Sequence, residues 1–202
     1  NDGSTDGSLE LLKDLENGDS SIIIISHFPN KGVKVTFLEG FLEFLSRGSS
    51  GDILVTFEAD NTFDEQLIGK MIEPIKSGSS DITLASCYSK GGGVEATNII
   101  RIFLSSVANL LIRLRFCLWE YHTLSSFDRA FSFECLKQAF SKEQLMTSDG
   151  YTCVVEMLIK LHRMDFKIVE IPMLLRSSRR KGKSKMPVLK TIFRYFILCI
   201  RI

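Results

Sequence analysis

The chain has 202 residues, of which 45% are hydrophobic and 24% are charged, a composition that is ordinary for one folded globular domain. A net charge of +1 excludes a protein that binds nucleic acid through its overall charge, and no nucleic-acid partner is expected. The five cysteines lie far apart and form no Cys-x-x-Cys pair, which excludes a disulfide or metal-binding framework and indicates a reducing compartment.

The first half of the chain alternates helical and strand-like patterns. Leu9, Leu12 and Leu15 recur at helical spacing and predict a helix, which Asp6 or Ser8 caps. In chain order, the next predicted elements are a buried strand at 21–25, a helix at 32–47, a strand at 52–57, a helix at 64–76 and a strand at 81–85.

The second half continues the alternation and ends in a basic stretch. A loop is predicted over 91–93, a long apolar helix over 97–118, a helix over 150–163 and a strand over 166–171. The stretch 177–185 (SSRRKGKSK) is predicted to be a mobile loop. Residues 187–202 predict either an interfacial helix or the approach to a transmembrane segment outside this chain, because no apolar run reaches the roughly 20 residues that span a bilayer.

This order of elements predicts an α/β fold with a mostly parallel sheet flanked by helices. The first element is a loop that leads into a helix, and in a doubly wound fold such a loop follows a strand, so we expect that an N-terminal strand is missing. Residues 1–176 are expected to form one catalytic domain, and residues 177–202 a basic loop and an amphipathic, membrane-interfacial helix.

The charges are unevenly distributed along the chain. Residues 176–202 contain Lys and Arg but no Asp or Glu, and residues 97–118 contain arginines but no acid. Basic segments with interleaved aromatic residues favour an anionic surface, either a membrane or a phosphate. A solvated charged face is the alternative interpretation.

The sequence contains two acidic motifs, one in a tight turn and one at the end of a predicted strand. Residues 1–8 (NDGSTDGS) form a tight turn in which Asp side chains can accept hydrogen bonds from a base or ribose, and the glycines permit close backbone approach. Glu58 and Asp60 lie two residues apart at a strand end, where both can reach one Mg²⁺ or Mn²⁺ ion whose remaining ligands are substrate phosphates. The alternatives are a turn with a helix cap and a pair of solvated acids.

In combination, the motifs resemble glycosyltransferase family 2, and within it the dolichol- or polyprenol-phosphate mannosyltransferase branch. The resemblance covers essentially the whole chain. Its seven segments, in the order of that family, are 1–8 (NDGSTDGS), 30–32 (NKG), 58–60 (EAD), 86–94 (SCYSKGGGV), 125–131 (SSFDRAF), 150–172 (GY to VEIP) and 182–186 (GKSKM). The resemblance implies the nucleotide-diphospho-sugar transferase (GT-A) fold.

The resemblance also implies roles for individual residues. Asp60 and Glu58 would hold the metal, and Asp60 and Arg129 would be catalytic, with Arg129 contacting phosphates of the donor or acceptor. Substrate-binding roles are implied for Asp2 at the nucleotide base and for Ser4, Asp6, Lys31, Ser86, Lys183 and Lys185. The helix at 97–118 would lie against the membrane where the lipid acceptor enters; a buried core helix is the alternative.

Three residues depart from the pattern of that branch. Glu58 replaces the first metal-binding Asp, so the geometry shifts and Asp60 dominates. Thr62 stands in place of a Gln that would serve as an auxiliary ligand, and Cys87 replaces an Arg expected at the donor diphosphate. These departures leave the donor open, as well as whether activity is retained.

The expected activity is an inverting transfer of mannose or glucose from a nucleotide-diphosphate sugar to a polyprenyl or dolichyl phosphate at the cytoplasmic face of a membrane, on which the protein is peripheral or anchored by a segment outside this chain. A lipid phosphate is already anionic, so no strong general base is required. With a hydroxyl acceptor a base is needed, and Asp128 is then the candidate, whereas His122 is interpreted as structural.

Other functions stay open from the sequence. One is a family-2 transferase that acts on a glycan or cell-wall acceptor. Another is a degenerate, non-catalytic domain that binds nucleotide sugars, which the departures at Glu58, Thr62 and Cys87 would support. A nucleotidyltransferase is a weaker alternative, because the Gly-rich activating loop expected near its N-terminus is not visible.

Overall fold

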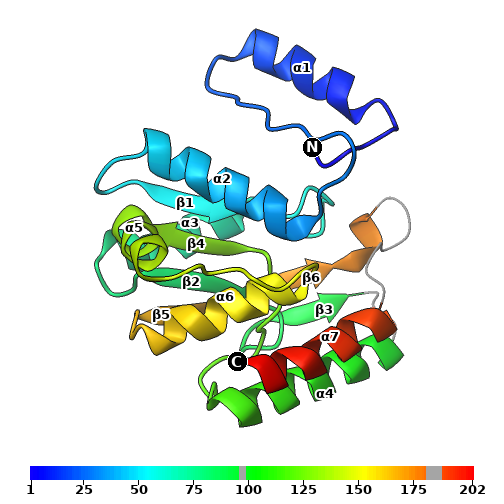
Figure 1. Ribbon diagram of the computed structural model, residues 1–202, viewed down its shortest axis with the longest axis vertical. Helices are drawn as coiled ribbons and strands as arrows, with labels where there is room; N and C mark the ends of the chain where they lie inside the picture. The colour runs from blue at the N-terminus through cyan, green and yellow to red at the C-terminus, as the bar shows by residue number, and fades with distance from the viewer. Residues whose placement is uncertain (96–98, 181–187) are drawn as a thin grey trace.

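A computed structural model describes residues 1–95, 99–180 and 188–202 as an α/β fold with a mixed sheet (Figure 1). The main sheet has the order β1 (Ile53–Thr56), β4 (Arg129–Ser132), β2 (Ile82–Ser86) and β5 (Ile168–Pro172). Strand β4 is antiparallel to both β1 and β2, whereas β2 and β5 are parallel, so β1, β2 and β5 run in one direction. Two further short strands, β3 (Gly93–Glu95) and β6 (Leu174–Arg176), pair in parallel in a separate sheet.

Helices cover both faces of the main sheet because successive strand side chains point to opposite faces. On β2, Ile82 and Leu84 join a core cluster with α2 (Val33–Arg47), α5 (Phe133–Lys142) and α6 (Thr152–Arg163). The alternate residue Ala85 packs instead with α3 (Gln66–Lys76), whose Leu67, Met71 and Ile75 form one buried stripe. The strand is therefore buried on both faces.

The remaining helices lie at the two ends of the molecule. Helix α1 (Ser8–Gly18) lies at one end together with the N-terminus, and none of its side chains is buried (Figure 1). At the other end, α4 (Ile99–Phe116) and α7 (Val188–Arg201) lie side by side, and Arg115 Nε donates to the Cys199 carbonyl oxygen across them at 2.9 Å. A short 3₁₀ helix, η1 (Ser177–Arg179), follows β6.

Most of the predicted elements are confirmed with small shifts of their ends. The helices predicted at 9–15, 32–47, 64–76 and 150–163 correspond to α1, α2, α3 and α6. The strands predicted at 52–57, 81–85 and 166–171 correspond to β1, β2 and β5. The helix predicted at 97–118 corresponds to α4, and its first residues lie outside the described part of the chain, as do residues 181–185 of the predicted mobile loop.

Several expectations about local structure were wrong. The run 21–25 forms no strand; Asn1 and Asp2 meet its end through the bond from Asn1 N to the Ile25 carbonyl oxygen and the isolated Asp2–His27 bridge. Neither Asp6 nor Ser8 occupies the N-cap of α1; Gly7 does, in the left-handed conformation. The loop predicted at 91–93 ends one residue earlier, since Gly93 begins β3.

The expectation of a mostly parallel sheet needs correction as well. The sequence pattern predicts no strand at the motif 125–131, yet residues 129–132 form β4 and insert antiparallel between β1 and β2. Two of the three pairings in the main sheet are therefore antiparallel. This insertion has a functional consequence, because the register places Thr56 opposite Arg129 and so brings the segment after β1 beside the segment before β4.

Candidate functional site

Three carboxylates gather where β1 ends and β4 begins. The Thr56 hydroxyl donates to the Phe127 carbonyl oxygen at 2.6 Å, which holds the two segments together. Two residues further on, the Glu58 backbone N–H donates to Asp128 Oδ1 at 3.4 Å. Asp60 completes the group, which we call the carboxylate cluster (Glu58, Asp60 and Asp128). The sequence placed Glu58 and Asp60 together, and the strand register adds Asp128.

Burial and mutual repulsion change the acidity of this cluster. Burial, reinforced by the negative charges of Asp60 and Asp128, raises the pKa of Glu58 to about 7. Asp128 is only 5% exposed, and its burial raises its pKa to about 6, with Asp60 adding to the effect. Both carboxyl groups therefore keep their protons to a higher pH than isolated acids, a perturbation that is typical of functional sites.

Asp60 is the carboxylate of the cluster that is already well partnered. Its Oδ1 accepts from the Thr62 backbone N–H at 3.1 Å and from the Thr62 hydroxyl at 2.6 Å. Its Oδ2 accepts from Arg180 Nε at 2.8 Å and also from Arg180 Nη2. Burial would raise the pKa of Asp60, but the hydrogen bonds from Thr62 and Arg180 together lower it. Thr62, which departs from the family pattern, thus supports Asp60 directly.

The donor atoms of Glu58 and Asp60 fit a hard divalent cation. Carboxylate oxygens are the protein ligands that Mg²⁺ prefers, and Mg²⁺ is usually held by one or two of them together with substrate phosphates. Burial is the main cause of the raised pKa of Glu58, with the charges of Asp60 and Asp128 adding to it, and a cation bound beside this carboxyl would favour its ionised form. Within residues 1–95, 99–180 and 188–202, no group of three or more His, Cys, Asp or Glu side chains is arranged to hold a metal ion.

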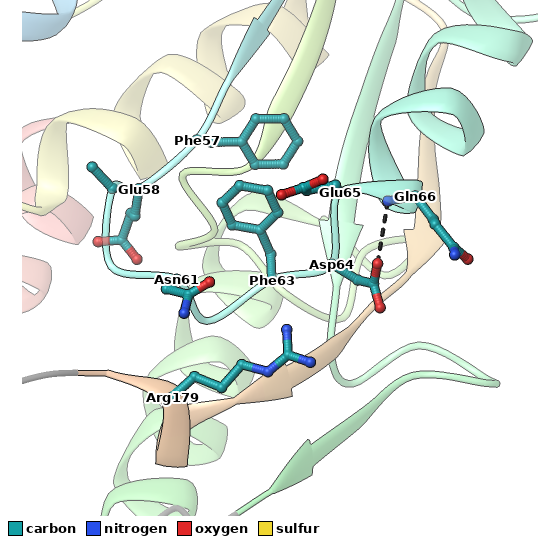
Figure 2. A pocket seen from close by; sticks show the side chains of 9 residues that line it. Phe57, Glu58, Asn61, Phe63, Asp64, Glu65, Gln66 and Arg179 are labelled. Atoms are coloured by element: carbon teal, nitrogen blue, oxygen red, sulfur yellow. Dashed lines mark hydrogen bonds between the residues drawn. The ribbon is translucent and has the colours of Figure 1, made fainter.

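A cavity of about 470 Å³ opens beside the cluster, between the loop after β1 and η1. Phe57 and Phe63 stack on each other with ring centroids 4.1 Å apart, and Glu58 and Asn61 lie next to them (Figure 2). Arg179 faces this loop from the opposite side of the cavity (Figure 2). Asn61 has a positive φ of 61°, which lets the chain turn sharply between the acidic motif and Phe63.

The N-terminal loop forms a second polar group, centred on Asp2 and His27. The Asp2 carboxylate accepts from the Lys31 and Gly32 backbone N–H groups at 2.7 and 2.9 Å and pairs with His27 Nδ1 at 3.0 Å. His27 Nε2 lies 2.6 Å from Glu39 Oε2. Asp2 therefore holds the start of α2 in place, and both of its oxygens already have partners within the chain.

The other predicted residues of this region are accessible. Ser4 lies in the exposed part of the turn, and its backbone N–H donates to Asn1 Oδ1 at 3.3 Å. Asp6 is exposed and accepts from the Ser8 backbone N–H at 3.3 Å. The Lys31 side chain is half exposed and pairs with Glu39 at 3.2 Å. Substrate-binding roles for these three residues stay predictions.

The charged state of His27 gives a testable pH dependence. Its hydrogen bonds to Glu39 and then Asp2 raise its pKa above the ordinary 6.5. The stabilisation is fully present below about pH 6.5 and is lost as the pH rises through the folded-state pKa. We expect His27→Gln to lower the melting temperature clearly at pH 6 and much less at pH values above the folded-state pKa, measured by circular dichroism. Glu39→Gln should flatten the same dependence; an equal loss at all pH values would contradict this assignment.

Arg129 does not reach the cavity, contrary to expectation. The side chain is 1% exposed, and its guanidinium donates to the carbonyl oxygens of Ser126, Val154 and Leu124 at 2.8 to 2.9 Å. This arrangement does not support a contact with substrate phosphates. A lone Arg in a motif does not reveal burial, and here the β4 register turns the side chain into the core.

Ser86 and Cys87 are also enclosed. The Ser86 hydroxyl lies 2.8 Å from the Thr123 hydroxyl and accepts from the Ser89 backbone N–H, so it organises the turn after β2. Burial raises the pKa of the Cys87 thiol, so the thiol stays neutral, and a cysteine cannot supply the positive charge of the arginine expected there. Glu170 accepts from the backbone N–H groups of His122 and Thr123 and pairs with the His122 ring. These contacts agree with the structural role that the sequence suggested for His122.

The basic stretch after β6 contains two predicted site residues and one that the sequence did not indicate. Lys183 and Lys185 lie outside the described part of the chain. Arg180, in contrast, was not singled out, although it contacts the acidic motif directly. The only sequence signal was the run of basic residues after Arg176, which does not indicate which side chain meets which acid.

The architecture is that of a known fold class. It is similar to glucosyl-3-phosphoglycerate synthase from Mycobacterium tuberculosis in complex with Mn²⁺, uridine diphosphate and glucosyl-3-phosphoglycerate, with a TM-score of 0.65 and 17% identity over 98% of this chain and 65% of that protein. The complex of the same enzyme with Mg²⁺ and uridine diphosphate gives a TM-score of 0.62 and 14% identity over 99% and 66%. At these identities the likeness shows the fold alone, which is the GT-A fold.

The sequence itself identifies the family. Residues 1–140 match the family model of glycosyl transferase family 2, and the chain belongs to this family. It is 31% identical over 194 residues to a dolichol-phosphate mannosyltransferase of Pyrococcus furiosus, covering 96% of this chain and 51% of that relative. It is 29% identical over 215 residues to a UDP-N-acetylglucosamine–dolichyl-phosphate N-acetylglucosaminyltransferase of Methanococcus voltae (98% and 82%), and 25% identical over 185 residues to an undecaprenyl-phosphate mannosyltransferase of Micrococcus luteus (92% and 73%). The chain thus spans about half the length of the Pyrococcus relative.

Proposed function

We propose that this chain transfers a sugar, mannose or glucose, from a nucleotide-diphosphate sugar to a polyprenyl or dolichyl phosphate, with inversion at the anomeric carbon and dependence on a divalent metal. The observation that carries the proposal is the carboxylate cluster at the end of β1, with Glu58 and Asp60 on one turn. The three relatives, which are named for polyprenyl- or dolichyl-phosphate acceptors, support the acceptor class.

The residues of the site account for the steps of such a transfer. A bound Mg²⁺ or Mn²⁺ would offset the charge on the leaving nucleoside diphosphate. Asp60 would hold this ion as the main ligand, and Glu58 would be the second. Asp128 accepts the Glu58 backbone N–H and thereby fixes the turn that aims both side chains. The acceptor phosphate is anionic at neutral pH, so the chain has to position it rather than remove its proton.

Asp128 supports a second candidate, a family-2 transferase with a hydroxyl acceptor. A sugar hydroxyl must lose its proton as it attacks, and a general base works best with a pKa near the working pH. Burial raises the pKa of Asp128 to about 6, and the residue lies directly beside Glu58. If this candidate is right, Asp128→Asn will abolish transfer to glycan acceptors, whereas transfer to polyprenyl phosphate needs no such base.

A degenerate binding domain is the remaining alternative, and donor binding separates it from the enzyme. Isothermal titration of the full-length protein with nucleotide sugars and Mn²⁺ is expected to give saturable binding that Asp60→Ala weakens. No binding of any nucleotide sugar would contradict the proposal and favour a scaffold that has lost the site.

We also propose that the face formed by α4 and α7 lies on the cytoplasmic surface of a membrane. Phe103 on α4 and Phe196 on α7 are each 65% exposed, and both helices expose further large apolar side chains: Ile99, Val107, Leu110, Leu111, Leu114, Phe193, Ile197 and Ile200. The sequences of both helices contain Lys or Arg and no acid. Apolar side chains with basic neighbours fit an interface rich in anionic lipid.

This face is not a spanning segment in the part of the chain that the structure describes. No helix among residues 1–95, 99–180 and 188–202 is both long and apolar enough to cross a bilayer. The two helices lie at the end of the molecule away from α1 (Figure 1), and both carry exposed large apolar side chains. The proposed mode of contact is therefore interfacial for this part of the protein.

Vesicle flotation tests the membrane face. The full-length protein is expected to float with vesicles that contain anionic lipid, and the variant Phe193→Ser/Phe196→Ser is expected to lose at least roughly tenfold in vesicle affinity, because two large apolar side chains no longer enter the interface. Leu11→Ser on α1 is the matched control, since Leu11 is equally exposed but distant from this face. Because basic residues contribute to the contact, added salt should weaken flotation. Equal flotation of the double variant and the natural protein, or flotation that salt does not change, would contradict the proposed surface.

A further inference from the structure

The segment after β6 folds back over the residues that follow the acidic motif. The Arg176 backbone N–H donates to the Thr62 carbonyl oxygen at 2.9 Å, and Arg176 Nη1 donates to Asp64 Oδ2 at 3.0 Å. Arg180 then reaches Asp60 with two guanidinium N–H groups on Oδ2. Two arginines four residues apart thus pair with two aspartates four residues apart. The fold-back segment (residues 176–180) is therefore fixed in register on the loop that carries Asp60.

The Arg180–Asp60 pair uses the atoms that a metal ion would need. Oδ1 of Asp60 already accepts two hydrogen bonds from Thr62, and Oδ2 accepts both hydrogen bonds from Arg180. The two side chains are 25% and 21% exposed, so solvent screens their attraction less than at an open surface. A cation that approaches Oδ2 meets the guanidinium at the same lone pairs and is repelled by its positive charge.

We propose that Arg180 is an intramolecular competitor of the divalent cation, holding Asp60 in a closed, self-paired state until the metal displaces it. This inference rests on the proposed metal role of Asp60. Entry of the cation breaks the two hydrogen bonds of Arg180 and frees its guanidinium, while Thr62 keeps Oδ1 in place. Arg176 and Asp64 remain paired and keep the fold-back segment close by. We call this contact between Arg180 and Asp60 the latch.

Binding of Mn²⁺ alone tests the latch without any turnover. In electron paramagnetic resonance titrations of the full-length protein, Arg180→Gln is expected to bind Mn²⁺ at least roughly fivefold more tightly than the natural protein. Arg179→Gln is the matched control, because it removes the same charge from the adjacent position without a hydrogen bond to Asp60, and its gain should be clearly smaller. Arg180→Lys keeps the positive charge but loses the contact through two N–H groups. Its affinity for Mn²⁺ should lie between the affinities of Arg179→Gln and Arg180→Gln.

The outcomes separate this inference from the proposed function. If Arg180→Gln and Arg179→Gln change the affinity equally, only general charge matters and the latch is overturned, while the metal role of Asp60 survives. If Asp60→Ala leaves Mn²⁺ binding unchanged, both the latch and the metal role fall. Melting curves of each variant show that the comparison is made between folded proteins.

Discussion

Asp60→Ala is expected to slow sugar transfer at least roughly a hundredfold, the usual cost of losing a main electrostatic element of a transfer site. The negative charge on the leaving diphosphate is greatest in the transition state, so the loss should appear in kcat and not only in KM. The measurement is the rate of transfer from a labelled nucleotide sugar by the full-length protein in the presence of Mn²⁺.

Stability and position must be controlled in this experiment. Asp60→Ala leaves Arg180 and also the backbone N–H and hydroxyl of the buried Thr62 without their acceptor, so the free energy of unfolding of the variant is measured beside its transfer rate. Asp14→Ala removes an exposed carboxylate on α1 and should leave the transfer rate unchanged. Undiminished transfer by Asp60→Ala would overturn the metal role.

Arg129→Met is expected to destabilise the fold by roughly 3 kcal/mol or more. Methionine is of similar length but leaves the carbonyl oxygens of Leu124, Ser126 and Val154 without a donor in the core. The measurement is the free energy of unfolding from urea titration of the full-length protein, provided that its transition is two-state.

A surface arginine provides the control for this substitution. Arg47 is 63% exposed in its side chain and pairs with Glu43 on the same helix, so Arg47→Met should change the free energy of unfolding by no more than about 0.5 kcal/mol. If Arg129→Met is instead stable but impaired in sugar transfer, that result would support the phosphate contact that the sequence motif suggested for Arg129.

The elements that depend on local pattern were predictable from the sequence, and those that depend on pairing were not. Strand β1 and the acids that follow it form one contiguous signal, because an apolar run ends directly at Glu58. Strand β4 is four residues long and carries a buried charge at its first position, so it has no recognisable alternation. Residues 21–25 show the opposite case, in which strong strand propensity lacks a neighbour to pair with.

The site shows the same division. The sequence indicated Glu58 and Asp60 because two carboxylates at a strand end have a recognised chemical use. The partners of Asp60 come from Thr62 nearby and from Arg180, 120 positions along the chain, and only the fold brings Arg180 there. The nucleotide-binding role of Asp2 stays a prediction; the structure shows its carboxylate engaged by His27 and by the start of α2, which no spacing rule reveals.

Product analysis tests the central claim most directly. The full-length protein and its Asp60→Ala variant would be incubated with Mn²⁺, labelled GDP-mannose or UDP-glucose, and either polyprenyl phosphate or soluble glycans. The account predicts that label enters an organic-extractable lipid product only when polyprenyl phosphate is present, and that Asp60→Ala abolishes it. Label that enters only the glycans, or no transfer from any donor, would contradict the proposed function.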